Sequence, residues 1–160
     1  MYQYSFANVD LTLQVPDANG DIQPITITGF GTGENLINCM RRAPIATTQF
    51  GAYGDMVVSM QRIQAGDLTF PVLMNAPENK VLQDFANHFQ SLAGGAGKLL
   101  VPIQAQMRDN MGKDVCVMTN GVILAMPSMV RGQTMNTITW VISFEKMEFT
   151  RENGADLDNL

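Results

Sequence analysis

The stretch 137-TITWVISFE-145 decides the fold class, because apolar and polar side chains alternate along its whole length. In a β-strand, successive side chains point to opposite faces of the sheet. A period of two therefore predicts a strand with one buried face and one polar face. We expect this strand to continue to about Arg151. Its buried face carries four large residues: Ile138, Trp140, Ile142 and Phe144.

Most of the remaining sequence has the same period of two. Two of the intervening stretches have the composition of turns. Ala65-Gly66-Asp67 is expected to join the strands on either side of it into a hairpin, and Asn120-Gly121 is expected to do the same further along the chain. The pattern predicts further strands over 2–6, 11–15, 25–29, 56–63, 67–73, 99–105, 115–117 and 122–124.

The segment over about 77–92 has a helical period instead, because its apolar residues recur every three or four positions with polar residues opposite. Asn75 and Glu78 have the spacing of a capping box at its start, and Gly94-Gly95 is expected to end it. The predicted fold class is therefore mostly β: a β-sandwich or barrel with one short α-helix.

Length and charge narrow the function class. The 160 residues are enough for about one domain, which we expect to span 1–150 and to be followed by a flexible tail over 151–160. The net charge of −5 argues against a protein that grips nucleic acid phosphates. No apolar run is long enough to span a membrane, and the first residues lack the pattern of a signal peptide. We therefore expect a soluble protein that is made in the cytoplasm.

The composition favours assembly. Charged residues make up only 16% of the chain, below the roughly 25% of an average domain, and the chain contains 12 Met. A free domain of this size usually covers its surface with charge. Met is common on surfaces that bury against partners, because it packs adaptably. Together these features favour a protein whose surface is largely covered by other subunits.

The sequence offers few groups for catalysis or metal binding. None of the motifs GxSxG, HExxH, GxxxxGKS/T and GxGxxG is present. The single His88 falls on the polar side of the predicted helix, and Cys39 and Cys116 lack the spacing of a zinc site. We therefore predict no enzyme, no cofactor and no metal. The two cysteines are expected to be reduced, with a disulfide between them left open.

Residues 40–54, MRRAPIATTQFGAYG, do not follow the strand pattern. A loop of this length is uncommon inside a compact domain and is usually functional or disordered. Its aromatic and arginine content favours contact with a partner. We expect loop 41–54 to serve assembly, with four residues at contacts between subunits or between rings: Arg41, Arg42, Phe50 and Tyr53.

Three segments, taken in order, point to a family. They are TGFGTGENLINCMRRAP over 28–44, GAYGDMVVSMQRIQAGDLTFPVLMNAPENKVLQDFANHF over 51–89, and TMNTITWVISFEKMEF over 134–149. Over roughly 2–150 the chain resembles the tail tube protein of contractile-tailed bacteriophages. In that family a segment like GDLTFPVL runs into a short helix, and the chain closes on a strand like TITWVI.

The resemblance implies hexameric rings that stack into a hollow tube in the virion tail, assembled in the host cytoplasm. Extended hairpins of the subunits would form one continuous barrel around the lumen. Double-stranded DNA would leave through this lumen, a contractile sheath would surround the tube, and the tape-measure protein would occupy the lumen without specific binding. Further implied partners are the baseplate or tube-initiator protein and the tail terminator, and no membrane is involved.

The lumen of such a tube must be wetted without holding phosphate. The polar positions of the predicted strands fit that wall, and they fit an ordinary solvated sheet face as well. The positions predicted to face the lumen are Thr26, Thr28, Ser59, Gln61 and Thr69. The acidic residues predicted to face the sheath are Glu145, Glu148 and Glu152.

Three alternative functions stay open at this point. A tube of a bacterial contractile injection or secretion system would share the fold. A baseplate or terminator ring would form single rings without polymerising. A monomeric β-sandwich that binds a ligand would stay monomeric and show a pocket lined by aromatic residues.

Overall fold

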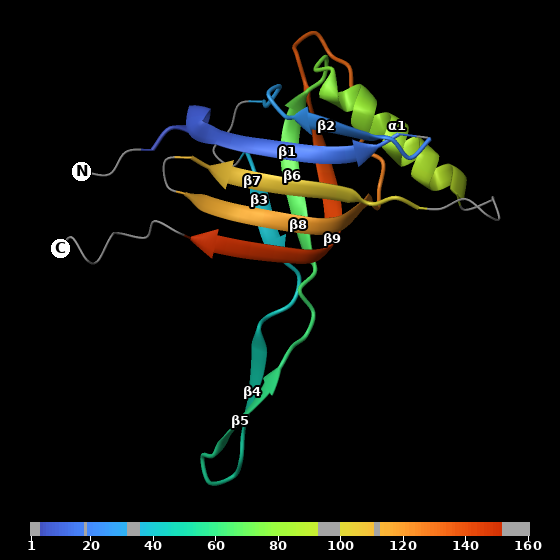
Figure 1. Ribbon diagram of the computed structural model, residues 1–160. Helices are drawn as coiled ribbons and strands as arrows, with labels where there is room; N and C mark the ends of the chain where they lie inside the picture. The colour runs from blue at the N-terminus through green and yellow to red at the C-terminus, as the bar shows by residue number, and fades with distance from the viewer. Residues whose placement is uncertain (1–3, 18, 32–35, 93–99, 111–112, 152–160) are drawn as a thin grey trace.

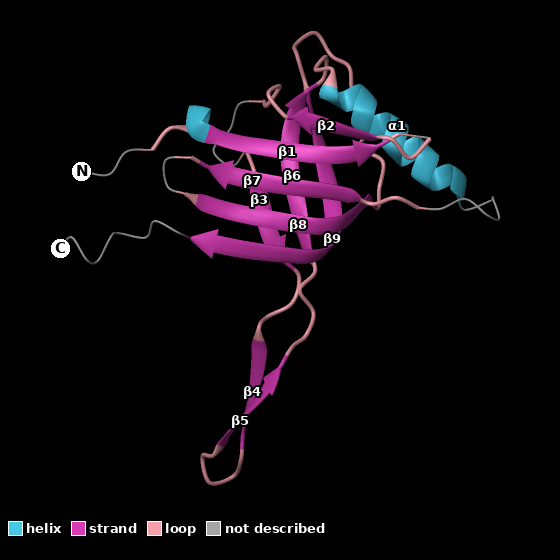
Figure 2. Ribbon diagram, viewed as in Figure 1, coloured by secondary structure: helices cyan, strands magenta, loops and turns pink. Residues whose placement is uncertain are grey.

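The computed structural model describes residues 4–17, 19–31, 36–92, 100–110 and 113–151. Within them, antiparallel strands form one large sheet in the order β2-β1-β7-β8-β9-β6-β3, and β4 and β5 form a separate hairpin (Figures 1 and 2). One helix, α1, spans Glu78–Ser91. The strands are β1 (Val9–Pro16), β2 (Ile22–Thr26), β3 (Asn38–Arg41), β4 (Ala46–Phe50), β5 (Met56–Met60), β6 (Gly66–Leu73), β7 (Ile103–Asp109), β8 (Asp114–Ile123) and β9 (Thr137–Arg151).

The longest strand, β9, joins two layers of the sheet. Its residues 137–144 pair with β6, whereas its residues 142–151 pair with β8. The buried side chains change phase between Phe144 and Met147, where the strand passes from one layer to the other. Figure 1 shows that β1, β7 and β8 consequently cross over β3 and β6 at a steep angle.

The fold class predicted from the sequence is confirmed, since the described chain is mostly β with one helix. The sheet is open in the single chain. Its end strands, β2 and β3, are each paired on one side only among the described residues. An unpaired strand edge can form hydrogen bonds with a strand of another chain. A protein with such edges therefore either protects them from pairing or uses them in assembly.

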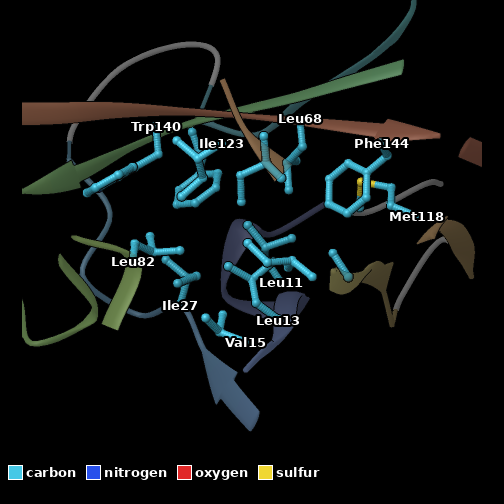
Figure 3. Close-up of a cluster of buried hydrophobic side chains, with 14 of the residues drawn as sticks. Leu11, Leu13, Val15, Ile27, Leu68, Leu82, Met118, Ile123, Trp140 and Phe144 are labelled. Carbon is cyan, nitrogen blue, oxygen red and sulfur yellow. The ribbon is translucent and has the colours of Figure 1, made fainter. Parts of the chain in front are cut away.

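The hydrophobic core lies between the two layers. In β6 burial alternates strictly along the strand, with one set of side chains facing inward. Figure 3 shows how side chains from β1, β6, β8 and β9 meet in this interior. Burial of one such large apolar side chain stabilises the fold by about 1.5–3 kcal/mol. The fully buried members include Leu11, Leu13, Leu68, Phe70, Leu82, Ile103, Trp140, Ile142 and Met147.

Helix α1 packs against β1 and turns its apolar stripe, with Leu82 and Phe85, toward the core. Its bounds agree with the predicted helix over about 77–92. A hydrogen bond from Trp140 Nε1 to Asn79 Oδ1, 2.9 Å long, ties the start of the helix to β9.

The predicted capping box at Asn75 is wrong. The N-cap residue is Pro77, and it makes no side-chain capping bond. Its fixed backbone angle already suits a helix start. The Glu78 carboxylate instead accepts hydrogen bonds from the backbone N–H and the hydroxyl of Thr28, at 3.2 and 3.1 Å. Burial opposes ionisation of Glu78, but backbone hydrogen bonds and those from Thr28 outweigh it and lower the pKa of this carboxyl group.

The predicted hairpin between 56–63 and 67–73 is wrong. Strand β5 pairs with β4, while β6 pairs with β3 on one side and β9 on the other. The segment 41–54 is accordingly not an irregular loop, because it contains β4. A period of two predicts where strands lie along the chain. It does not predict which strands pair, because pairing depends on contacts between residues that are distant in sequence.

The predicted turn at Asn120-Gly121 is also wrong, because β8 runs straight through it. The register between β7 and β8 shifts between Ile103 and Ala105, and Asn120 adopts a φ of 58°. Asn tolerates this left-handed conformation better than most residues. A Cβ on Gly121 would lie 2.4 Å from the ring of Phe144, so only glycine leaves space for that ring. The Asn-Gly pair therefore forms a β-bulge instead of a turn.

Several other predictions concern the ends of the chain and the cysteines. No strand begins within 4–6, where Phe6–Asn8 form a 3-10 turn instead. Gly94-Gly95 and most of the predicted tail, 152–160, lie outside the described residues. Cys39 and Cys116 are free thiols, and the hydrogen bond with Cys39, together with burial, raises the pKa of Cys116. In the described chain, no helix has the length and apolar character to cross a membrane.

Candidate assembly surfaces

An arm formed by residues 43–64 extends from the body, away from α1 (Figure 1). Strands β4 and β5 pair along it, in a register that runs from Ala46 opposite Met60 to Phe50 opposite Met56. The Gly51 N–H donates to the Asp55 carbonyl at 2.7 Å and closes the tip. Gly54 supplies the positive φ, 87°, that this tight turn requires.

The arm exposes apolar side chains on both faces. All residues of β5 are exposed, although four of the five are Met or Val. The side chain of Phe50 is 71% exposed, and that of Tyr53 at the tip is 99% exposed. A two-stranded hairpin is marginal on its own in water, and a contiguous apolar patch of this kind marks an interaction site. The exposed large residues of the arm are Ile45, Phe50, Tyr53, Met56, Val57, Val58, Met60 and Ile63.

The two arginines predicted to contact other subunits lie at the root of the arm and bind groups of their own chain. Arg41 donates from Nε and Nη2 to the Met147 carbonyl at 3.0 and 2.7 Å, and its guanidinium lies 5.9 Å from the centre of the Phe149 ring. Arg42 forms a 2.8 Å ion pair with Asp67 and donates to the Ser143 hydroxyl at 2.7 Å. The hydrogen bond from Arg42 lowers the pKa of Asp67. These contacts fix the direction in which the arm leaves the body, and a further role between subunits stays a prediction.

The five residues predicted to face the lumen do not share one face. Thr26 ends β2, and Thr28 is engaged by Glu78 next to α1. Ser59 and Gln61 lie on the arm, and Thr69 lies in β6. These positions therefore belong to different parts of the molecule, and in β5 the alternation does not mark one buried face, because all its residues are exposed. A lumen-facing role of the five residues stays a prediction.

A more continuous polar surface covers the outer face of β1, β7 and β8. It contains a shallow depression lined by hydroxyl and amide side chains together with the apolar residues Ala105, Val117 and Met118. The charges around it occur in opposite-sign neighbours: Asp10 is opposite Arg108 across β1 and β7, and Lys146 forms a 2.7 Å ion pair with Glu148. The sequence signal was present, because these residues occupy the polar positions of alternating strands. The uncharged polar residues of the depression are Thr12, Gln14, Gln104, Gln106 and Thr119.

The predicted sheath-facing residues have different surroundings. Glu145 accepts a hydrogen bond from Asn120 Nδ2 at 2.8 Å. Glu148 is opposite Val117 of β8, so it lies on the polar outer face described above. Glu152 lies outside the described residues.

An apolar groove of about 640 Å³ lies between the second half of α1 and the end of β8. Ala86 and Ile123 are buried at its base, and Phe89 and Leu92 of the helix side line it. The segment 124–136, which connects β8 to β9, contributes the exposed side chains of Leu124 and Met126 to its lining. Among the described residues no group of three or more potential metal ligands comes together.

Comparisons with known proteins give one matching family and several solved structures of similar fold. The family model described as bacteriophage PhiTE tail tube protein matches residues 1–150. No curated protein sequence matches this chain. Among solved structures, the sheath/tube terminator of PVC, an extracellular contractile injection system, has a TM-score of 0.57 at 7% identity and covers 94% of this chain and 98% of its own.

Two further solved structures have the same fold. The tube-terminating cap of the anti-feeding prophage has a TM-score of 0.52 at 9% identity, with 94% of this chain and 93% of that chain covered. A chain of the PVC sheath–tube complex has a TM-score of 0.50 at 8% identity, with 88% of each chain covered. At such identities the likeness shows the shared fold alone.

Proposed function

Because this chain belongs to the family of the bacteriophage PhiTE tail tube protein, we propose that it polymerises into the hollow tube of a phage tail and conducts double-stranded DNA during ejection. The chain is a structural component of the virion tail, as its family implies. In the proposed assembly, hexameric rings form in the host cytoplasm and stack into the tube. A contractile sheath surrounds it.

The observation that carries this proposal is the exposed apolar arm. Within the described part of the chain, no residue covers β5, and the end strands of the main sheet have one unpaired edge each. Both features are liabilities for a monomer, since they promote association. In a closed ring of identical subunits, each open edge and each arm contacts a neighbour.

The dimensions of such a ring fit its cargo. With four strands from each of six subunits, a barrel of about 24 strands, spaced by about 4.8 Å and tilted by about 40°, has a backbone diameter of about 48 Å. Side chains leave on the order of 40 Å of open channel, which admits a DNA duplex of about 20 Å. We assign the channel wall to the polar outer face of β1, β7, β8 and the adjoining second half of β9, in place of the five residues chosen from the sequence.

This wall suits DNA that slides without being held. Amide and hydroxyl side chains such as Gln106 and Thr119 are wetted but carry no charge. The basic residues of this face, Arg108 and Lys146, each have an acidic neighbour. Under this assignment Glu148 faces the channel, so it cannot also face the sheath. The sheath, baseplate or initiator and terminator proteins then contact other surfaces, and the tape-measure protein fills the channel before DNA does.

The channel wall has a direct test. Gln106→Lys adds an unpaired positive charge to the proposed wall, and we expect tubes that assemble normally in virions that eject DNA more slowly. The matched control is Gln133→Lys in the segment 124–136, which is exposed and lies outside the proposed wall and the arm, and it should leave the ejection rate of assembled particles unchanged. If Gln106→Lys virions eject at the wild-type rate, the wall lies elsewhere.

The function itself is tested by negative-stain electron microscopy of the purified protein, alone and with its sheath protein. We expect long hollow tubes of uniform diameter, around which the sheath protein assembles. Single rings that do not stack would support the alternative of a baseplate or terminator ring. Particles that remain monomeric at high concentration would contradict both and support a ligand-binding module.

A further inference from the structure

We propose that the apolar groove beside α1 receives the arm tip of a second copy of this chain. This inference rests on the proposed assembly and adds the receiving site for the arm. The exposed aromatic residues of the tip are Phe50 and Tyr53. The residues that line the groove include Phe89, Ile123, Leu124 and Met126.

The two surfaces match in chemistry. Strands β4 and β5 with their connecting turn contain one charged residue, Asp55, and none of the residues lining the groove is charged. Burying one against the other therefore removes apolar area from water without desolvating an ion pair. The Met126 sulfur accepts a hydrogen bond from Gln83 of α1 at 3.1 Å, which holds the rim of the groove against the helix. Met side chains at such a rim adapt to the shape of an inserted ring.

The groove has the size of a pocket that takes an anchoring side chain. The groove volume of about 640 Å³ falls within the range of about 300–1,000 Å³ that is typical of ligand-sized pockets. Aromatic side chains that anchor in such pockets dominate the energetics of interfaces. The exposed rings of Phe50 and Tyr53 are anchors of this kind.

The partner is a second copy because the arm cannot reach the groove of its own chain. The arm leaves one end of the body, whereas α1 lies beside the other (Figure 1). The contacts of Arg41 and Arg42 with β9 and β6 fix the root of the arm in this direction. A contact between two different surfaces of identical chains is heterologous, so each added copy presents a free arm and a free groove. Such contacts generate closed rings or open helical stacks.

Photo-crosslinking of assembled protein tests the location. A p-benzoylphenylalanine residue replaces Tyr53, which is so exposed that the change leaves the fold intact. We expect covalent dimers whose crosslinks map by mass spectrometry to the second half of α1 or to residues 123–126. The control places the same group at Tyr4, which is 72% exposed on the body. Crosslinks from position 53 that map elsewhere on a neighbour would overturn the inference.

A pair of matched substitutions tests the energetics. Met126→Glu places a charge at the rim of the groove, and we expect the critical concentration for assembly to rise about tenfold or more. Met135→Glu changes the same residue type in the same segment, outside the groove and at similar exposure, and should assemble like wild type. Circular dichroism shows whether each variant folds. If Met126→Glu does not fold, the crosslinking experiment tests the receiving site by itself.

The results distinguish a failure of the groove as the receiving site from a failure of the proposed tube function. If wild-type protein forms tubes but the crosslinks map outside the groove, the groove is not the receiving site and the tube function still stands. The same conclusion follows if the two Glu variants change the critical concentration equally. Wild-type protein that forms no assembly at all would overturn the proposed function and this inference with it.

Discussion

Strands β5 and β6 follow each other in the chain and are both rich in apolar residues, yet their surroundings are opposite. In β6 buried and half-buried residues alternate strictly, and the strand is paired on both sides, by β3 and β9. In β5 every residue is exposed, and its one strand partner among the described residues is β4. This difference shows that β6 builds the fold of one chain, whereas β5 has the composition of a core strand but is not covered by any residue that the structure describes.

The largest expected effect is the difference in the free energy of unfolding between two phenylalanine variants, one in β6 and one in the arm. Phe70→Ala in β6 removes a fully buried ring and should lower the free energy of unfolding by about 3–5 kcal/mol. Phe50→Ala in β4 removes an exposed ring and should change it by less than about 0.5 kcal/mol. Urea denaturation of dispersed, monomeric protein measures both. Equal losses would show that the arm is part of the folding core, and the contrast between the two regions would fail.

The second effect concerns assembly. The double variant Phe50→Ser/Tyr53→Ser removes both aromatic anchors of the arm, and each anchor is expected to contribute about 2 kcal/mol or more to contacts between copies. We expect folded protein that no longer forms tubes, judged by circular dichroism and electron microscopy. Thr47→Ser and Thr48→Ser on the same arm serve as a control for a change without loss of an aromatic ring. Normal polymerisation of the double variant would show that the arm tip does not contribute to the interface between copies.

A third, smaller effect compares two glycines. Gly121→Ala would place a methyl group 2.4 Å from the Phe144 ring and should destabilise the fold by about 1–3 kcal/mol. In the arm, the nearest atom to a Cβ on Gly51 is 3.7 Å away, so Gly51→Ala should be tolerated. Thermal unfolding distinguishes the two variants. A wild-type melting temperature for Gly121→Ala would mean that the bulge in β8 repacks freely.

The smallest effect concerns the junction between the two regions, where Arg42 pairs with Asp67. The hydrogen bond from Arg42 lowers the folded-state pKa of Asp67 below its unfolded value. The pair therefore stabilises the fold fully above the unfolded pKa, and this contribution is lost as the pH falls through the folded pKa. Asp67→Asn should be slightly less stable than wild type at pH 7, with the difference vanishing in acid. A difference that stays constant down to low pH would contradict this origin.

Elements defined by local pattern could be predicted from the sequence. The alternation that begins at Thr137 predicted β9 to its end at Arg151, and the helical period predicted α1 to within one residue at each end. Both patterns reflect which side of one segment is buried, and that information is contained in the segment itself.

Pairing and surface placement could not be predicted in this way. The turn-like composition of Asn120-Gly121 also fits a bulge, and only the Phe144 ring across the strand pair decides between them. The apolar residues of β5 looked like a core strand because composition does not say which chain covers them. The aromatic residues of 41–54 predicted a contact segment, and that role stays a prediction. The two arginines before the arm bind carbonyl and carboxylate groups far away in the sequence, which no local pattern could indicate.

A cryo-electron microscopy reconstruction of the assembled protein tests the central claim most directly. Tyr53 is 99% exposed in the single chain, and we predict that in the assembly it is buried against a neighbouring copy, with the residues of β5 covered around it. An assembly in which the arm projects into solvent and touches no other copy would contradict the account.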